Sequence, residues 1–299
     1  MIDKHLHMSA ATEPMVLFEL IKENGLKIKA KNYLEFEKST KTNNSKNLDD
    51  YLSVLHAIEK IQQSPKAVER STYSCFRSSY LSGCTVLELR WNPYKRCDKF
   101  SIDMDSLILS SLSGMSKAKR IFGIKGTQAF CLGTDVSEEA NEAILKKAIL
   151  YKDSGVTTLD LAGPVKNLKS ITDTGIDKHF KKARENGLML TIHAGEELRE
   201  DTEDELNFVI DLKPDRIGHG VQLHRYPYLM KRVSNLNIEL EICISSNIAT
   251  KSVESTEYFK QIFKQFSDYG IKYSINTDAT FSLDTTIQKE HEIYQSLKS

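Results

Sequence analysis

Strand-like runs recur along this chain with helical patterns between them, and this alternation constrains its fold more than any other feature. Most runs are nearly continuous in apolar or β-branched residues, which is typical of parallel strands covered on both faces. We predict strands at residues 2–7, 85–91, 127–132, 157–162, 189–193, 216–218, 238–244 and 272–276. This order predicts an α/β fold, a (β/α)8 TIM barrel, in one domain over residues 1–299.

Three segments between the strands carry clear helical patterns. Ser137 is placed to cap one helix, because two glutamates follow it in the first turn. A second pattern covers residues 174–186 and ends at a glycine, and a third covers 257–269. A long helical insertion, residues 10–84, follows the first strand. Its polar stretch 39–47 is either a solvated loop or a lid over the barrel mouth.

Charge and cysteine content bear on partners and location. Lys plus Arg and Asp plus Glu both number 41, and this balance argues against nucleic acid and suits a small-molecule partner. The five cysteines form no C-x-x-C pair, and Cys131 and Cys243 lie in strand-like runs, which favours a reducing compartment. We find no targeting pattern or membrane-length apolar run, so we expect a cytoplasmic protein without a membrane partner. The sequence leaves the oligomeric state open.

Ionisable residues stand at the C-terminal ends of several predicted strands. Parallel barrel strands end on one face, so residues far apart in the sequence converge there. His5 and His7 point to the same side, because alternate residues of a strand share a face. We expect convergence of His5, His7, His193, His219 and Asp278. The remaining histidines are expected to be ordinary surface or packing residues: His56, His179, His224 and His291.

Three imidazoles and a carboxylate, without thiolate, are typical of a catalytic zinc site with one position open to water. Water bound to such an ion loses a proton near neutral pH. His219 would then act beside that water, and Glu196 would donate a proton to the substrate. Alternatively, Glu196 belongs to a solvated helix start and His219 is a core histidine. Glycines on both sides of His219 leave space beside it and favour the catalytic interpretation.

Seven short motifs resemble, in order, those of the adenosine deaminase family of zinc aminohydrolases. They are H-x-H at 5–7, E-x-R-x-x-P at 88–93, D-L-A-G at 160–163, T-I-H-A-G-E at 191–196, R-I-G-H-G at 216–220, C-x-S-S-N at 243–247 and N-T-D at 276–278. The match covers nearly the whole chain. The resemblance implies zinc-dependent hydrolytic deamination of adenosine or a related 6-aminopurine, with release of ammonia, in purine nucleotide metabolism.

The resemblance also implies roles for individual residues. It places one Zn2+ per chain on His5, His7, His193 and Asp278. Glu196 would protonate a purine ring nitrogen, and His219 would assist the attacking hydroxide. Gly163 would contact the purine through its backbone.

Two positions depart from the family pattern on the substrate side. Ser9 stands where an aspartate usually binds the ribose 5′ end, and Ala279 stands where an aspartate usually bonds a purine ring nitrogen. The loss of such polar contacts changes substrate discrimination strongly. The predicted substrate contacts are His7, Ser9, Gly163 and Ala279.

Alternative functions stay open. A metal hydrolase or deaminase of the same fold could act on another substrate, although two-metal members usually need a lysine that residues 160–163 do not offer. A catalytically silent purine-binding relative would fit the changed Ser9 and Ala279, but it would not need Glu196. The cytidine-deaminase signature H-x-E with P-C-x-x-C is absent. Residues 245 and 246 are serines outside any G-x-S-x-G elbow, so we expect them to form hydrogen bonds near the metal.

Overall fold

The computed structural model describes residues 1–97 and 103–298, and in this part of the chain eight parallel strands pair in chain order. All eight predicted strands are present, with ends that differ from the prediction by at most two residues. The strands are β1 (Ile2–His7), β2 (Val86–Trp91), β3 (Lys125–Gly133), β4 (Val156–Ala162), β5 (Met189–Ala194), β6 (Arg216–His219), β7 (Glu239–Ile242) and β8 (Lys272–Ile275).

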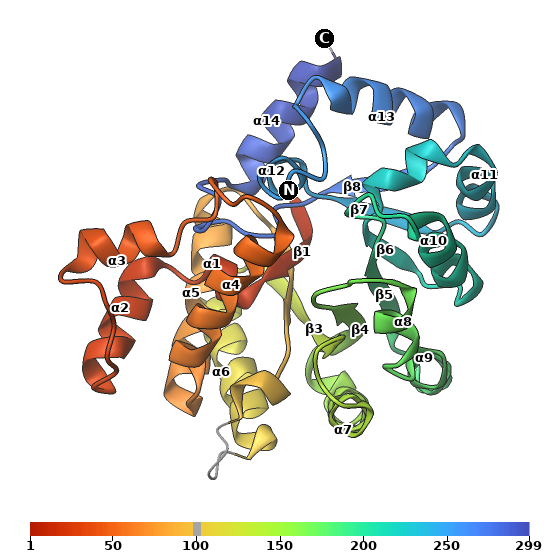
Figure 1. The fold of residues 1–299 in the computed structure, drawn as a ribbon. Helices are drawn as coiled ribbons and strands as arrows, with labels where there is room; N and C mark the ends of the chain where they lie inside the picture. Colours follow the sequence, from red (N-terminus) through yellow and green to blue (C-terminus); the bar gives the residue numbers. More distant parts are fainter. Residues whose placement is uncertain (98–102, 299) are drawn as a thin grey trace.

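Backbone contacts at the end of β8 close the sheet onto β1. The N–H of His7 donates to the carbonyl of Asp278 at 2.9 Å, and the N–H of Asp278 donates to the carbonyl of His5 at 2.7 Å. Leu6 and Asp278 form a parallel bridge at the same place. Helices surround the resulting barrel (Figure 1). The predicted (β/α)8 TIM barrel is confirmed.

Helices follow the strands along the rest of the chain. Ser137 caps one of them as predicted, because its Oγ accepts the N–H of Ala140 at 3.2 Å. The helices after β2 are α6 (Met104–Phe122), α7 (Glu138–Leu150), α8 (Leu168–Thr172), α9 (Ile176–Glu185), α10 (Thr202–Asp211), α11 (Pro227–Asn235), α12 (Ile244–Ala249), α13 (Tyr258–Asp268) and α14 (Ile287–Lys298). Short 3-10 helices cover Lys60–Gln62, Tyr94–Arg96, Lys152–Ser154 and Val221–Arg225. The two other predicted helices are α9 and α13.

The insertion between β1 and β2 is helical, and α2 and α3 project to one side of the barrel (Figure 1). It comprises α1 (Met8–Ala11), α2 (Pro14–Glu23), α3 (Tyr33–Ser39), α4 (Leu48–Glu59) and α5 (Pro65–Leu81). The polar stretch after α3 is attached to the loop after β8: the N–H of Thr42 donates to the carbonyl of Ser282 at 2.8 Å, and Lys41 Nζ donates to the carbonyl of Phe281 at 2.7 Å. This attachment favours an ordered loop over a mobile lid.

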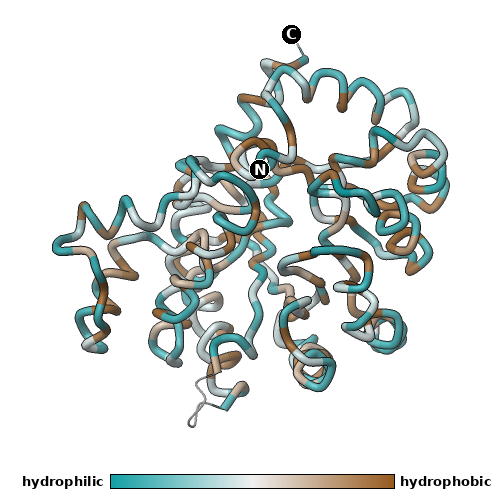
Figure 2. The backbone as a smooth tube through the Cα atoms, viewed as in Figure 1, coloured by the Kyte–Doolittle hydropathy of each residue, from teal (hydrophilic) through white to brown (hydrophobic). Residues whose placement is uncertain are grey.

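The apolar core lies between the strands and the helices around them. Trp91 on β2 packs edge-on against Phe130 on β3, with ring centroids 5.5 Å apart. Along the outer helices, hydrophobic and hydrophilic residues alternate, as expected of helices with one buried face (Figure 2). Within the described ranges, we find no helix with the length and apolar character needed to span a bilayer.

Candidate active site

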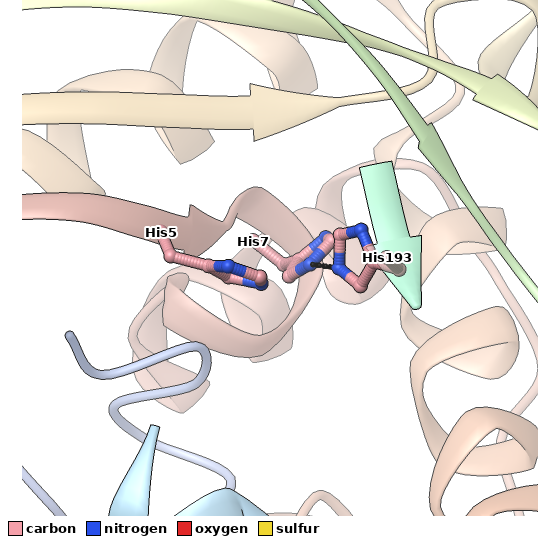
Figure 3. Close-up of side chains that lie close together, drawn as sticks. All are labelled: His5, His7 and His193. Carbon is pink, nitrogen blue, oxygen red and sulfur yellow. Dashed lines mark hydrogen bonds between the residues drawn. The ribbon is translucent and has the colours of Figure 1, made fainter. Parts of the chain in front are cut away.

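Three histidine rings meet where β1 and β5 end. The ring centroid of His5 lies 5.3 Å from that of His7 and 4.6 Å from that of His193, and the last two are 5.2 Å apart. Figure 3 shows the three side chains converging from the two strands, with Nε2 of His7 3.1 Å from Nε2 of His193. The structure therefore brings together the three imidazoles that the sequence pointed to.

Asp278 and His219 complete this cluster. Oδ1 of Asp278 lies 3.6 Å from Nε2 of His5 and 3.4 Å from Nε2 of His7. The ring of His219 lies 4.9 Å from that of His5, centroid to centroid. Both Asp278 and His219 have a φ of 61°. This left-handed conformation costs a non-glycine residue about 1–3 kcal/mol and is concentrated at functional sites.

Two carboxylates bind the Nδ1 atoms of His5 and His193, on the side of each ring that faces away from the cluster. Nδ1 of His5 donates to Glu241 at 2.9 Å, and Nδ1 of His193 donates to Asp160 at 3.2 Å. Arg90 joins the two carboxylates, because its guanidinium donates to each of them at 3.0 Å. An ionised carboxylate only accepts hydrogen bonds, so each ring carries its proton on Nδ1. The lone pair of each Nε2 is then free to face the centre of the cluster.

The surrounding charges favour ionised carboxylates and a neutral His5, whereas attraction to Asp160 outweighs burial and raises the pKa of His193. Burial raises the pKa of Asp160, but attraction to His193 and Arg90 outweighs it and brings this pKa far below its usual value. Attraction to Arg90 likewise overcomes burial and lowers the pKa of Glu241. Burial lowers the pKa of His5 well below its usual value, as it does for the other histidine of β1. Neutral imidazole beside ionised carboxylate is the state that a metal ion requires of its ligands.

The donor set fits a metal ion. Nε2 of His5 is buried and has no hydrogen-bond partner among the described residues, a situation that costs about 1–3 kcal/mol unless another partner is present. The ligand atoms of two sets lie within 4.8 Å of one another: His5, His7 and His193 form one set, and His5, His219 and Asp278 form the other. Imidazole nitrogen and carboxylate oxygen, without a thiolate, suit Zn2+ in a catalytic site.

Glu196 and His219 lie side by side next to the cluster. Oε2 of Glu196 is 3.6 Å from Nε2 of His219. Asn247 Nδ2 lies 3.1 Å from Nδ1 of the same histidine and fixes its orientation. Glu196 belongs to the loop after β5, ahead of α10, so it is not part of a solvated helix start. Both side chains line one cavity, which favours the catalytic interpretation of the pair.

The cavity includes most of the predicted substrate contacts. His7, Ser9 and Gly163 line it. Gly163 has a φ of 132°, and a Cβ there would lie 2.6 Å from Oγ1 of Thr134, so only glycine fits. Ala279 is fully buried instead. It is not among the lining residues, and its contact with substrate stays a prediction.

Helix α4 forms part of the cavity wall and connects it to the cluster of histidines and Asp278. Tyr51 on α4 lines the cavity, and its hydroxyl donates to Oδ2 of Asp278 at 3.1 Å. Tyr51 also packs with Ala279 in a small apolar cluster. His56, which we expected to be an ordinary surface or packing residue, lies in the same wall. No feature of the sequence assigns α4 to the site.

Sequence reasoning also missed the charged groups beneath the rings. Asp160 and Arg90 were noticed only as parts of motifs, and Glu241 was not singled out. A signal was nevertheless present, because each of these charges interrupts an apolar strand. Charged side chains are almost never fully buried unless they are paired. Ser246, by contrast, was expected to bond near the metal, and its Oγ donates to Asp278.

Residues 1–298 match the adenosine deaminase family. The chain belongs to that family. It is therefore a metal-dependent aminohydrolase, and the expected deamination of adenosine or a related purine is the activity of its class.

Individual relatives agree with this assignment. The adenosine deaminase of Vibrio atlanticus is 26% identical over 289 residues, which cover 97% of this chain and 85% of the relative. The crystal structure of Arabidopsis ADAL complexed with IMP superposes with a TM-score of 0.84 at 23% identity, covering 100% of this chain and 86% of that one. An amidohydrolase from Burkholderia ambifaria with bound Zn has a TM-score of 0.84 at 19% identity, covering 99% and 79%. At these identities, the two structures support the fold.

Proposed function

We propose that this protein is a zinc-dependent aminohydrolase that acts on adenosine or a related 6-aminopurine. One Zn2+ per chain would be held by His5, His7, His193 and Asp278. The observation that carries the proposal is the buried Nε2 of His5, which lacks a partner among the described residues and lies 3.6 Å from the Asp278 carboxylate. When bound, the ion would act as a Lewis acid and lower the pKa of a water molecule.

Residues of the chain itself would move the protons. His219, held by Asn247, would take a proton from the attacking water. Glu196 would give a proton to a purine ring nitrogen, which prepares the neighbouring carbon for attack by the water oxygen. His219 would pass the proton that it took to the amino group, so that the bond between this group and the carbon breaks and ammonia leaves, while Glu196 recovers a proton from the added hydroxyl. The 3.6 Å between Glu196 and His219 suits two proton transfers at one reacting carbon.

The substrate assignment draws on the relatives and on the cavity wall. The Vibrio relative is named an adenosine deaminase, and the Arabidopsis structure holds IMP. Ser9 and His7 line the cavity beside the metal cluster. The backbone of Gly163, which no Cβ shields, would allow a flat purine ring to approach closely.

A second candidate is deamination of a different amino-heterocycle by the same machinery. The change to Ser9 removes a carboxylate from the cavity wall, and Ala279 is buried among apolar side chains. Both observations concern substrate contacts, whereas Glu196 and His219 keep their place at the cavity. The reaction type is thus shared by the two candidates, and only the ring or its substituents differ.

Ammonia release from a panel of 6-aminopurine bases, nucleosides and nucleotides tests the proposal. The panel should include other amino-heterocycles, and protein metal content should be measured in parallel. We expect turnover of at least one 6-aminopurine with one Zn2+ per chain, loss of turnover after chelation, and recovery when zinc is returned. Absence of turnover across the purines with zinc fully loaded would defeat the proposal.

Glu196→Gln separates catalysis from zinc binding. A general acid contributes about 10²–10⁴-fold to the rate, so we expect a loss of this size in kcat with the zinc content unchanged. Glu200→Gln is the matched control, because Glu200 lies in the same loop and is exposed. Equal activity of the Glu196→Gln enzyme and the wild type would remove Glu196 from the mechanism.

A further inference from the structure

Helix α12, directly after β7, contacts three functional groups of the site through its own side chains and that of its C-cap residue. The contacts are Ser246 Oγ to Asp278 Oδ2 at 2.5 Å, Asn247 Nδ2 to His219 Nδ1 at 3.1 Å, and Thr250 Oγ1 to Glu196 Oε1 at 3.3 Å. One short helix therefore touches a proposed metal ligand and both proposed proton-transfer groups. Any shift of this helix moves all three contacts together.

The N-terminus of α12 is held from outside the helix. Its N-cap residue, Cys243, makes no side-chain capping hydrogen bond, although the first N–H groups of any helix need acceptors. Glu290, on α14, supplies one: its Oε2 accepts the N–H of Ser245 at 3.2 Å. Oε1 of the same carboxylate accepts the hydroxyl of Thr285 at 2.6 Å.

Glu290 is an unusual residue to find in this position. Its side chain is fully buried, and a buried carboxylate is costly unless its oxygens are well bonded. An apolar side chain would attach α14 to the barrel without that cost, as Ile287 does on the same helix, where it joins the main core. The carboxylate adds two hydrogen-bond acceptors at a set distance from α14. One of them accepts a hydrogen bond from the first turn of α12.

We propose that Glu290 is a positioning residue, which fixes α12 and through it the orientation of Asp278, His219 and Glu196. The inference rests on the proposed function for its catalytic part. It concerns a residue 45 positions from Ser245 in sequence that contributes no atom to the cavity wall described above. Partners that orient metal ligands from outside the site typically matter about 10–100-fold for metal affinity or activity.

Three substitutions of Glu290 separate the effects of its side-chain length, its negative charge and its volume. Glu290→Gln keeps an acceptor oxygen at the same reach but removes the charge. Glu290→Asp keeps the charge but withdraws it by one methylene, and Glu290→Met keeps only the volume. Tyr294→Phe is the matched control on the same helix, because it removes the hydroxyl that bonds Tyr273 on β8 at 2.9 Å.

Each variant is purified with zinc and measured for kcat, KM, zinc affinity by competition with a chelator, and Tm. We expect Glu290→Met to lower kcat and zinc affinity by about 10-fold or more, with KM nearly unchanged. Glu290→Gln should stay close to wild type, and Glu290→Asp should fall between them. Tyr294→Phe should lower Tm without changing kcat or zinc affinity.

The outcomes are decisive even if one variant fails. A Glu290→Met protein that loses Tm but keeps wild-type kcat and zinc affinity overturns the proposal. If Glu290→Met does not fold, the kcat and zinc affinity of the other two variants decide. Higher values for Glu290→Asp than for Glu290→Gln would overturn the proposal, because they would mean that the charge matters and the position of the acceptor oxygen does not. If the wild type shows no deamination, the zinc affinities alone test the positioning role, independently of the proposed function.

Discussion

Asp160 Oδ1 lies 3.2 Å from His193 Nδ1, and the other oxygen of the same carboxylate accepts a hydrogen bond from Arg90 at 3.0 Å. The carboxylate thus fixes both the orientation and the tautomer of a proposed zinc ligand. Its partner across the site, Glu241, does the same for His5 through the same arginine. The guanidinium of Arg90 therefore holds both carboxylates, and through them it orients two histidines that come from different strands, β1 and β5.

Replacing this carboxylate by its amide tests the relationship. In Asp160→Asn the side-chain volume is kept, but the amide can present its N–H₂ to His193 and lose the ion pair with Arg90. We expect zinc affinity to fall by about 10–100-fold, measured by competition with a chelating dye. Asp153→Asn, at an exposed position, is the control. Unchanged zinc affinity in Asp160→Asn would show that this carboxylate does not orient the ligand.

Gly218→Ala should displace the ligands sterically. A Cβ at this position would lie 3.0 Å from Cε1 of His5 and 3.3 Å from Nδ1 of His193. Overpacking of this kind costs about 1–3 kcal/mol, so we expect zinc affinity to fall roughly tenfold or more, as measured by calorimetry. Gly187→Ala is the control: it strains a positive φ but meets no atom within 4 Å. It should lower Tm and leave zinc affinity intact, and the same zinc affinity in both variants would contradict the steric argument.

The fold and the convergence of the histidines with Asp278 were predictable because both follow from short-range patterns. Continuous apolar runs identify buried parallel strands, and the strand-end rule then places His5 and Asp278 on one face although they lie at opposite ends of the chain. No detailed packing is needed for either step. Strand ends were less certain, as the strand at Lys125–Gly133 shows, which begins two residues before the predicted start.

The surroundings of the site were not predictable, because they depend on packing between distant segments. Nothing local to α4 indicates that Tyr51 reaches Asp278, since the path of the long insertion decides it. Glu290 meets Ser245 across 45 residues and carries no motif. Substrate contacts are harder still to predict, because they depend on the ligand as well: Ala279 occupies a family position by sequence, and its contact with substrate stays a prediction.

Buried neutral histidines predict a loss of stability in mild acid. Burial lowers the pKa of His224, whose ring contacts the Val221 carbonyl and the Tyr258 hydroxyl. The unfolded chain binds a proton here below about pH 6.5, whereas the folded chain does so only at lower pH. The contribution to stability is therefore complete above that pH and is lost as the pH falls. In urea titrations from about pH 7 to 5, unfolding free energy should fall less steeply for His224→Gln than for wild type; equal slopes would contradict this.

Ser9→Asp should shift preference toward a substrate with a free ribose 5′-hydroxyl. Ser9 lines the cavity beside His7, and the family resemblance places the ribose 5′ end at this position. A hydrogen bond to a charged acceptor is worth about 1.5–3 kcal/mol, so KM for adenosine should fall about tenfold or more. Adenine, which has no ribose, is the matched substrate and should show no gain. An equal gain with both substrates, or none with adenosine, would mean that the ribose does not reach Ser9 and that the substrate binds in another orientation.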